Sequence, residues 1–429
     1  METINEKIQY QSEQKGSSVV LEAARETLAL LQGEDVCRGP AARVQTFVEH
    51  LQDQQMTVAV IGQFKRGKSA LSNRILGGDI LPVGIVPITS AVTRVVYGDP
   101  GAQVRFLDGE VRPVENAELS TYISEQENKG NRLRVEEVKI QSPAAFLEGG
   151  ITFLDTPGVG SFHKNNTEVA YRYMKESDAV IFLLSVDSPI NQIEIDFLAG
   201  TQEFAGKFYF AVNKIDLAAS EDLEIYLAYC RDVLVELTGQ ETLRLFPVSA
   251  KTGDGVEELK AAVRADLAQN GKAILEESVR KKLMDAIDEG IRQLHFCWKA
   301  VNLSYQELDE KFQAMDAFCK QVRQDAAETS GTYELVLNRM REKTSDQVKE
   351  LFGMEYTYPV TEQPAGTSFM TQETFLQEVE STLTEIQAVL SSAILYREEN
   401  AYAVVRRASA LNRLERKLRK IREMLASRA

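Results

Sequence analysis

The residues between 57 and 76 place the strongest constraint on the fold. A run of apolar, mostly β-branched residues from Thr57 to Ile61 is followed at once by Gly62-Gln-Phe-Lys-Arg-Gly-Lys-Ser69, and then by residues 70–76 with helical spacing. The run predicts a buried strand, and the spacing of the two glycines, the lysine and the serine is typical of a loop that wraps a phosphate with backbone N–H groups. The helix after such a loop points its positive N-terminus at the anion. The sequence therefore predicts a strand–loop–helix unit that binds phosphate.

Individual positions of this loop have expected roles. Lys68 is expected to reach the β- and γ-phosphates, and Ser69 to ligate Mg²⁺ through its hydroxyl oxygen. Glycines let the backbone approach the anion closely. The predicted phosphate-binding residues are Gly62, Lys65, Gly67, Lys68, Ser69 and Ala70.

A second apolar run, Ile151–Leu154, leads directly into Asp155-Thr-Pro-Gly158. Because carboxylates bind Mg²⁺ directly or through its waters, Asp155 is expected near the metal through a water molecule. The N–H of Gly158 is expected at the γ-phosphate. The sequence thus predicts a magnesium site that Ser69 and Asp155 build together with the nucleotide.

Two later segments predict which base the site binds. Asn213-Lys-Ile-Asp216 follows an apolar run at Phe208–Val212, and Val248-Ser-Ala-Lys251 follows a further strand. A carboxylate at Asp216 can accept hydrogen bonds from both N1–H and the exocyclic amine of guanine, whereas adenine offers no such pair of donors. Guanine nucleotide is therefore the expected ligand. The predicted base-binding residues are Asn213, Lys214, Asp216, Ser249, Ala250 and Lys251.

Three regions of the chain differ in hydrophobic pattern. Residues 57–272 alternate short Val- and Ile-rich runs with helical stretches, which is typical of a mostly parallel sheet with helices on both faces. Residues 1–56 and 273–429 carry apolar residues three and four apart, which predicts long helices that pack on one another, as in a coiled coil. A loop is expected at about 353–370, and a break in the preceding helix at Gly331. We therefore expect an α/β P-loop domain and an all-α helical bundle or hairpin that the N-terminal helices join.

The amino-acid composition excludes some classes of function and of cellular location. The net charge of −15, from 49 basic and 64 acidic residues, argues against a nucleic-acid partner, which favours a basic surface. The first residues lack the apolar core of a signal peptide, and no run reaches the roughly 18 apolar residues of a spanning helix. The four cysteines are widely spaced, so neither a disulfide framework nor a zinc site is expected. A cytoplasmic protein is the expectation.

Over about residues 57–255 the chain resembles the dynamin-like GTPases, especially the bacterial and mitofusin-like members. Besides the motifs above, Leu76-Gly-Gly-Asp-Ile-Leu-Pro-Val-Gly-Ile-Val-Pro-Ile-Thr89-Ser-Ala-Val-Thr93 is similar to the start of that family's switch I. The resemblance implies hydrolysis of GTP to GDP and phosphate, with Thr89 as the Mg²⁺-sensing threonine and Thr93 as the alternative. It also implies Mg²⁺ and a monovalent cation as cofactors, a homodimer through the GTPase heads, and flanking helices that form a bundle which moves during turnover.

The resemblance also assigns catalytic candidates. Val159 follows the switch II glycine, so the glutamine that orients water in Ras-like enzymes is missing. Gln63 matches the dynamin glutamine directly after the first loop glycine; the alternative is a glutamine that bonds only within its own loop. Lys65 and Arg66 lie where related enzymes carry an arginine finger in cis, and a solvated arginine is the alternative. The expected catalytic residues are Gln63, Lys68, Thr89 and Arg66.

Two features bear on membrane binding. Apolar residues gather around the predicted loop, where they could form a membrane-contacting tip or pack on the helices. Residues 404–429 hold nine Lys and Arg and two Glu, which suits an anionic membrane or acidic helices of the same bundle. The tip candidates are Phe352, Met354, Tyr356, Tyr358, Val360, Phe369, Met370 and Phe375. The acidic partners considered are Asp309, Glu310, Asp316, Asp325 and Glu328.

The sequence thus favours a dynamin-like GTPase whose head dimer remodels or tethers membrane, peripherally from the cytoplasm. Two alternatives stay open: a regulatory or ribosome-associated GTPase switch, and a GTPase scaffold that acts through a protein partner without lipid. The acidic balance, and the lack of a recognisable basic RNA-binding module after the GTPase domain, favour the first function over the ribosome-associated switch.

Overall fold

The chain folds into two compact units. The computed structural model describes residues 4–15, 17–82, 92–106, 108–124, 127–128, 131–156, 174–202, 204–240, 243–329, 333–354, 372–399 and 401–428. Asp53–Lys281 form one unit, here called the head, and Met1–Gln52 together with Lys282–Ala429 form the other, here called the bundle. From the sequence we placed the head at 57–272. A single helix, α9 (Val256–Asn302), runs through the second boundary.

The head is built on one nine-stranded sheet in the order β4-β3-β5-β2-β6-β1-β7-β8-β9. β1 pairs in parallel with β6 and β7, and β7, β8 and β9 continue in parallel. β2 runs antiparallel to β6, and β3 antiparallel to β4 and β5. The strands are β1 (Met56–Ile61), β2 (Val92–Tyr97), β3 (Gly101–Phe106), β4 (Val111–Val114), β5 (Val135–Ser142), β6 (Ile151–Asp155), β7 (Ala179–Ser185), β8 (Lys207–Asn213) and β9 (Leu245–Pro247).

The burial of each strand explains why some strands could be recognised from the sequence and others could not. Every residue of β1, β6 and β7 is buried, so these strands read as continuous apolar runs. β3 alternates buried and more exposed residues, and β4 is mostly exposed, so their apolar signal is weaker. The predicted α/β P-loop fold with a mostly parallel sheet is confirmed, with a mixed extension at one edge, where β2 and β5 pair in parallel, that the clearest apolar runs did not include.

Helices of the head pack on the sheet through aromatic and aliphatic side chains. The Phe182 ring of β7 meets the Phe210 ring of β8 edge-on, with centroids 6.1 Å apart. Phe197 and Leu234 are buried in the same cluster from α7 and α8. The helices of the head are α4 (Lys68–Leu76), α5 (Leu119–Ile123), α7 (Gln192–Thr201), α8 (Ser220–Thr238) and the first part of α9.

The first part of α9 is fixed to the head by buried polar contacts. The Asp178 carboxylate accepts hydrogen bonds from the backbone N–H of Thr57 (2.9 Å) and from the hydroxyl of Ser278 (2.9 Å). A Cβ on Gly206 would lie 2.1 Å from the Ile274 carbonyl oxygen, so only glycine permits this approach of the helix. The head therefore includes α9 well beyond the predicted end at residue 272.

The bundle contains more helix breaks than the apolar spacing predicted. α9 ends at Asn302, and Ser304 caps a new helix by accepting the N–H of Glu307 while Glu307 accepts the N–H of Ser304. The predicted break at Gly331 lies outside the described residues, between α10 and α11. The helices of the bundle are α1 (Ile4–Lys15), α2 (Val19–Leu31), α3 (Arg38–Asp53), the last part of α9, α10 (Tyr305–Glu328), α11 (Tyr333–Phe352), α12 (Gln372–Glu399) and α13 (Ala401–Ala426).

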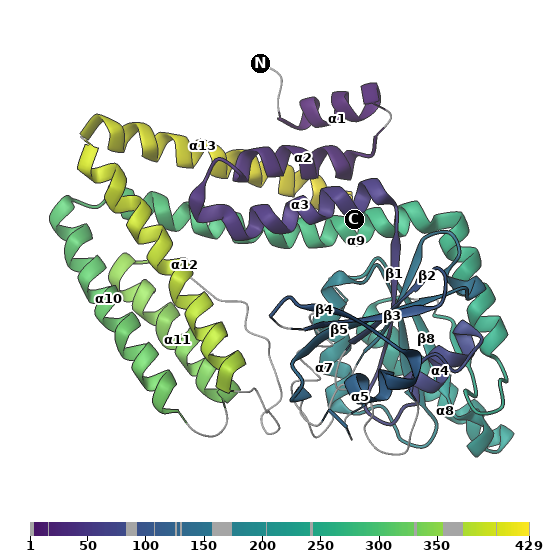
Figure 1. Ribbon diagram of the computed structural model, residues 1–429. Coiled ribbons are helices and arrows are strands. Elements are labelled where there is room, and N and C mark those ends of the chain that lie inside the picture. The colour runs from purple at the N-terminus through teal and green to yellow at the C-terminus, as the bar shows by residue number, and fades with distance from the viewer. Residues whose placement is uncertain are drawn as a thin grey trace. The chain divides into compact units, whose positions relative to one another are not determined.

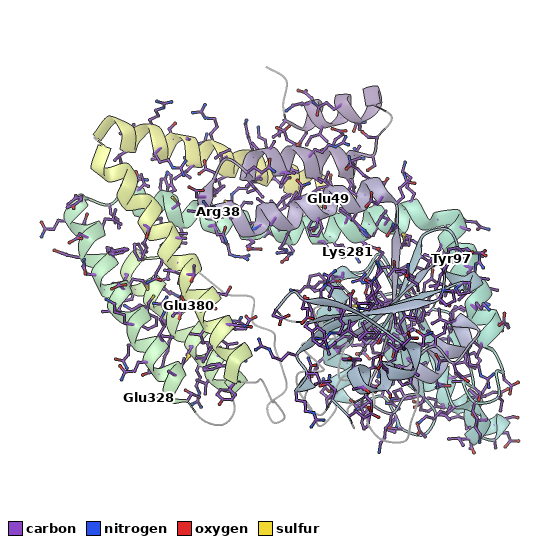
Figure 2. The ribbon with its side chains drawn as sticks, in the orientation of Figure 1. Arg38, Glu49, Tyr97, Lys281, Glu328 and Glu380 are labelled. Atoms are coloured by element: carbon purple, nitrogen blue, oxygen red, sulfur yellow. The ribbon has the colours of Figure 1, made fainter. Side chains whose placement is uncertain are left out.

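Helices of the bundle share one apolar core. In Figure 1, α2, α3 and α13 lie along the last part of α9, and α10, α11 and α12 lie side by side. Glu380, labelled in Figure 2, lies on the outside of the second group and accepts two hydrogen bonds from Arg323, of 2.7 and 2.9 Å. Three tip candidates, Phe352, Met354 and Phe375, are buried in this core, which excludes them as a membrane tip. The other five lie outside the described residues.

The basic helix α13 is partly paired within the bundle. Arg407 forms an ion pair with Glu34, both nearly buried, and Arg422 donates to Asp288 at 2.5 Å. These partners precede α3 or lie on α9, so the acidic residues of α10 that we considered from the sequence are not the ones used among the described contacts. Four basic side chains with spacings of seven, four and three remain exposed along one face: Arg406, Arg413, Lys417 and Lys420.

We predict that Arg407→Ala lowers the free energy of unfolding by about 3 kcal/mol, because it leaves the Glu34 carboxylate buried without its partner. Arg406→Ala, one residue away and exposed, is the matched control and should change stability by less than about 0.5 kcal/mol. Urea denaturation followed by circular dichroism measures both. Equal stability of the two variants would show that this ion pair does not hold α13 in place.

Candidate nucleotide site

The site lies at the edge of the sheet where the carboxyl ends of parallel strands meet. β1, β6, β7, β8 and β9 all end there, and each is followed by one of the segments singled out from the sequence or by α7. In open α/β sheets, ligands bind outside the carboxyl ends of the strands. The predicted phosphate and base segments are therefore brought together.

Two glycines allow the phosphate loop to close on its neighbours. A Cβ on Gly62 would lie 2.4 Å from the carbonyl oxygen of Leu183 on β7. Gly67 has φ +91°, a conformation that L side chains rarely adopt, and its Cβ would lie 2.5 Å from Nδ2 of Asn213. Both glycines are thus required by packing as well as by close approach to a phosphate.

Lys68 is held at the start of α4 with its charge turned toward the loop. Its ammonium group donates to the carbonyl oxygen of Gln63 at 3.2 Å. Burial lowers the pKa of Lys68 to about 8, partly opposed by the charge of Asp155. An anion in the loop would favour the charged form, so the site is electrostatically suited to phosphate.

Ser69 and Asp155, the residues expected to hold Mg²⁺ directly and through a water molecule, lie side by side. The Ser69 hydroxyl donates to Asp155 at 2.7 Å, and the Ser72 hydroxyl donates to the other carboxylate oxygen at 3.2 Å. Burial raises the pKa of Asp155, while the hydrogen bond from Ser69 and the charge of Lys68 lower it. A hydroxyl and a desolvated carboxylate side by side are hard oxygen donors, which fit Mg²⁺. Thr89 and Gly158 lie outside the described residues, and Thr93 is buried in β2 opposite Asp155.

The base segments are cross-linked to the phosphate loop. Asn213 donates to the carbonyl oxygen of Arg66 at 2.8 Å and accepts from the N–H of Ala250 at 2.9 Å. Lys214 donates to the carbonyl oxygen of Lys65 at 2.7 Å and to Asp187 at 2.6 Å. One amide side chain and one ammonium group therefore fix three loops relative to one another.

Asp216 is oriented by the last of these segments. One carboxylate oxygen accepts from the Ser249 hydroxyl at 2.7 Å, and the Lys251 ammonium lies 3.8 Å from the other. Arg74 of α4 supports the same segment by donating to the carbonyl oxygens of Ala250 (2.9 Å) and Lys251 (2.8 Å). Sequence reasoning missed Arg74 because its partners follow about 180 positions later and no motif marks them.

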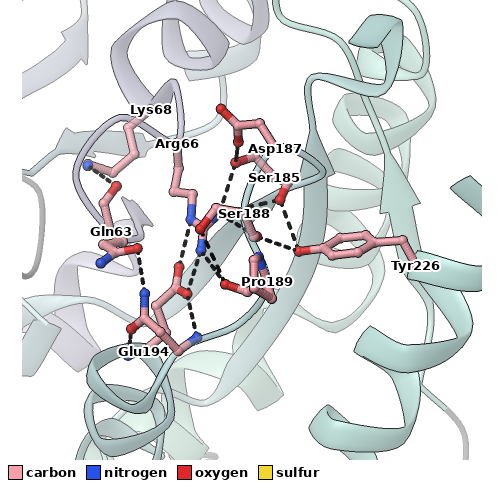
Figure 3. A network of polar contacts seen from close by, with 10 residues as sticks. Gln63, Arg66, Lys68, Ser185, Asp187, Ser188, Pro189, Glu194 and Tyr226 are labelled. Atoms are coloured by element: carbon pink, nitrogen blue, oxygen red, sulfur yellow. Dashed lines mark hydrogen bonds and ion pairs between the residues drawn. The ribbon is translucent and has the colours of Figure 1, made fainter. Parts of the chain in front are cut away.

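Arg66 does not occupy the position of an arginine finger. Its guanidinium is 2% exposed and donates to the Glu194 carboxylate at 2.9 and 2.6 Å, away from solvent. It also donates to carbonyl oxygens at the end of β7 and just after it, at Ser185, Ser188 and Pro189 (Figure 3). Neither the finger nor the solvated alternative describes this side chain, because a buried ion pair binds it to α7. Lys65 is exposed, beside the Phe64 ring.

Gln63 also contacts α7. Its side-chain oxygen accepts a hydrogen bond of 2.7 Å from Nδ2 of Asn191, the N-cap residue of that helix. The alternative expected from the sequence, a glutamine that bonds only within its own loop, is therefore wrong. Asn191 and Glu194 were not candidates from the sequence, although Asn191-x-x-Glu194 is a capping-box signal.

Comparisons with known proteins agree with this geometry. Residues 58–216 match the dynamin family. The chain is 28% identical over 332 residues to an uncharacterized protein in the xynA 3′ region of Caldicellulosiruptor sp., which covers 71% of this chain and 79% of that protein. It is 30% identical over 237 residues to dynamin-like protein 2 of Campylobacter jejuni, covering 54% of this chain but only 38% of the relative.

A solved structure of an oligomerised bacterial dynamin pair is also similar, with a TM-score of 0.44 and 18% identity over 94% of this chain and 78% of that one. The family match includes the phosphate loop, Asp155 and the segment that ends at Asp216. The family resemblance inferred from the sequence is confirmed for residues 58–216, which form a dynamin-family GTPase domain, and such a domain implies hydrolysis of GTP to GDP and phosphate.

Proposed function

We propose that this GTPase hydrolyses GTP fastest as a dimer of heads, and that the cycle serves to tether or remodel membrane that the bundle contacts peripherally from the cytoplasm. The observation that carries the catalytic part is the position of Gln63, within the phosphate loop and hydrogen-bonded to Asn191.

In this proposal Lys68 binds the β- and γ-phosphates, Ser69 ligates Mg²⁺, and Asp155 binds one of its waters, with Thr89 as a further ligand. Bound Mg²⁺ would neutralise charge on the phosphate oxygens. A monovalent cation is a second candidate cofactor. Asp216 accepts the two guanine donors, and its contact with Ser249 supports this role because it presets the carboxylate before the base arrives.

Gln63 is the proposed residue that orients the attacking water. Val159 has no side chain able to do so, and the ion pair with Glu194 removes Arg66 from consideration. A single polar side chain beside an exposed loop holds water poorly, and a second head across the nucleotide would exclude bulk solvent and order both sites. Dimerisation is therefore expected to raise the rate.

The exposed basic face of α13, formed by Arg406, Arg413, Lys417 and Lys420, supports the membrane part of the proposal. Basic residues near an anionic leaflet contribute about 1 kcal/mol each to binding. Among the described residues no helix is long and apolar enough to cross a bilayer. The competing function, a scaffold that acts through a protein partner without lipid, becomes one outcome of the flotation test below.

Asp216→Asn is expected to weaken GTP binding and to favour xanthosine triphosphate, whose C2 oxygen complements an amide donor. Titration with fluorescent analogues of both nucleotides measures the two affinities and shows which nucleotide each variant prefers. The exposed carboxylate of Asp222, on α8, provides the matched control: Asp222→Asn should bind GTP like the parent. Unchanged GTP affinity in Asp216→Asn would remove this residue from the base site.

Turnover per molecule is expected to rise as the protein is concentrated, and GDP with aluminium fluoride should promote a head dimer in sedimentation. Gln63→Ala should lose turnover while it keeps GTP affinity, because the interaction is made mainly in the transition state. We expect about 1 to 3 kcal/mol of coupling between dimerisation and nucleotide state. A flat rate over a long dilution series, with a monomer in the mimic-bound state, would contradict dimer activation.

The protein should float with vesicles that contain phosphatidylserine, more strongly than with pure phosphatidylcholine. Arg413→Glu combined with Lys417→Glu should weaken this binding by at least about tenfold, from roughly 1 kcal/mol per basic residue. Arg105→Glu combined with Lys139→Glu, on the exposed side of β3 and β5, is the matched control. No flotation of the parent with either GTP analogue or GDP would favour the protein-scaffold function.

A further inference from the structure

In the first turn of α7, elementary chemistry decides which side-chain atoms donate hydrogen bonds and which accept them. The backbone N–H of Glu194 can only donate, and it donates to Oδ1 of Asn191 at 3.2 Å. The amide nitrogen of Asn191 is therefore the group that faces Gln63, and it donates to Oε1 of Gln63 at 2.7 Å. A backbone donor thus determines which atom of Gln63 points toward α7.

The same turn is anchored to the phosphate loop by charge. Glu194 accepts two hydrogen bonds from Arg66, and these side chains are only 1% and 2% exposed. Glu194 also accepts from the backbone N–H of Asn191 at 3.3 Å. Because removal of one partner from a buried ion pair is strongly unfavourable, Asn191 is held at a fixed distance from the loop that carries Gln63.

Gln63 lies in the part of the phosphate loop that is expected to face the phosphates of the nucleotide. Gln63 directly follows Gly62, and its carbonyl oxygen accepts from the ammonium of Lys68 (Figure 3). Because Oε1 points toward Asn191, Nε2 is the atom at the end of the Gln63 side chain that can turn toward the nucleotide. An amide nitrogen donates hydrogen bonds and accepts none.

We propose that Asn191 is a positioning residue for GTP hydrolysis: it holds Gln63 so that amide N–H groups, and not the carbonyl oxygen, face the attacking water and the transferred phosphoryl group. This inference rests on the proposed role of Gln63. Gln63 then donates hydrogen bonds to oxygen atoms of the attacking water and of the transferred phosphoryl group. The N-cap residue of α7, and not the nucleotide, determines which way the Gln63 amide is turned.

Asn191→Asp replaces the donor that faces Gln63 with an acceptor and leaves the shape of the side chain almost unchanged. A carboxylate caps a helix as well as an asparagine does, so the bond to the N–H of Glu194 is retained. It presents an acceptor to Oε1, so Gln63 must reverse its amide or lose the contact. We expect kcat at saturating GTP to fall about tenfold, with KM and the melting temperature close to the parent values. Asn191→Ser also caps the helix but is too short to reach Gln63, and it should lower kcat as well.

A double-mutant cycle separates positioning from a structural effect. In a Gln63→Ala background, Asn191→Asp should cause no further loss of kcat, because the residue through which Asn191 acts is already gone. A loss in that background as large as in the parent would overturn the proposal, since Asn191 would then act through the stability of α7. Sedimentation with GDP and aluminium fluoride should show that Asn191→Asp dimerises like the parent.

The two proposals can fail separately. If Gln63→Ala is slow but Asn191→Asp has the parent kcat, the positioning role of Asn191 is refuted and the role of Gln63 stands. If Gln63→Ala hydrolyses GTP as fast as the parent, both roles are refuted.

Discussion

Parallel pairing of β1 between β6 and β7 is the constraint on which the site depends. In this register Val58 lies opposite Phe153 on one side and Ala179 on the other, so the three strands end at the same edge. All three are buried throughout, and a shift of one residue would exchange the faces on which their side chains pack. The apolar core therefore fixes the distance between the phosphate loop, Asp155 and the segment after β7.

Polar cross-links then refine what the sheet brings together. Asn213 connects the phosphate loop to the segment at Ala250, and Arg66 connects it to α7. These bonds reach across 37 to 147 positions of the chain. Because each cross-link joins loops that follow different strands of the same sheet edge, a change in one loop can reach the others through two or three bonds. The geometry at the phosphates is thus a property of the whole edge and not of the loop alone.

Sequence patterns predicted the candidate ligand-binding residues more completely than the residues that hold those candidates in place. Lys68, Ser69 and Asp216 lie in short motifs whose spacing follows from the shape of a nucleotide, and the sheet brings their segments together. The partner of Arg66 lies 128 positions away and could not be inferred from spacing, so a buried anchor looked like a finger or a solvated side chain. In the bundle, apolar residues continue three and four apart through Ser304, which hid a helix start that only the capping pair Ser304–Glu307 marks.

A buried ion pair at this point is better explained by geometry than by stability. Taking the Arg66 guanidinium and the Glu194 carboxylate out of water costs energy that their attraction offsets only if both are fully hydrogen-bonded, and two apolar side chains of similar volume could pack as well. Apolar side chains, however, have no directional bonds. Glu194 accepts from Arg66 and from the backbone of Asn191, and its own N–H orients the Asn191 side chain. A chain of directional hydrogen bonds therefore runs from the phosphate loop through α7 and back to Gln63. If an apolar side chain replaced any member, the donors and acceptors along this chain would no longer determine the orientation of the Gln63 amide.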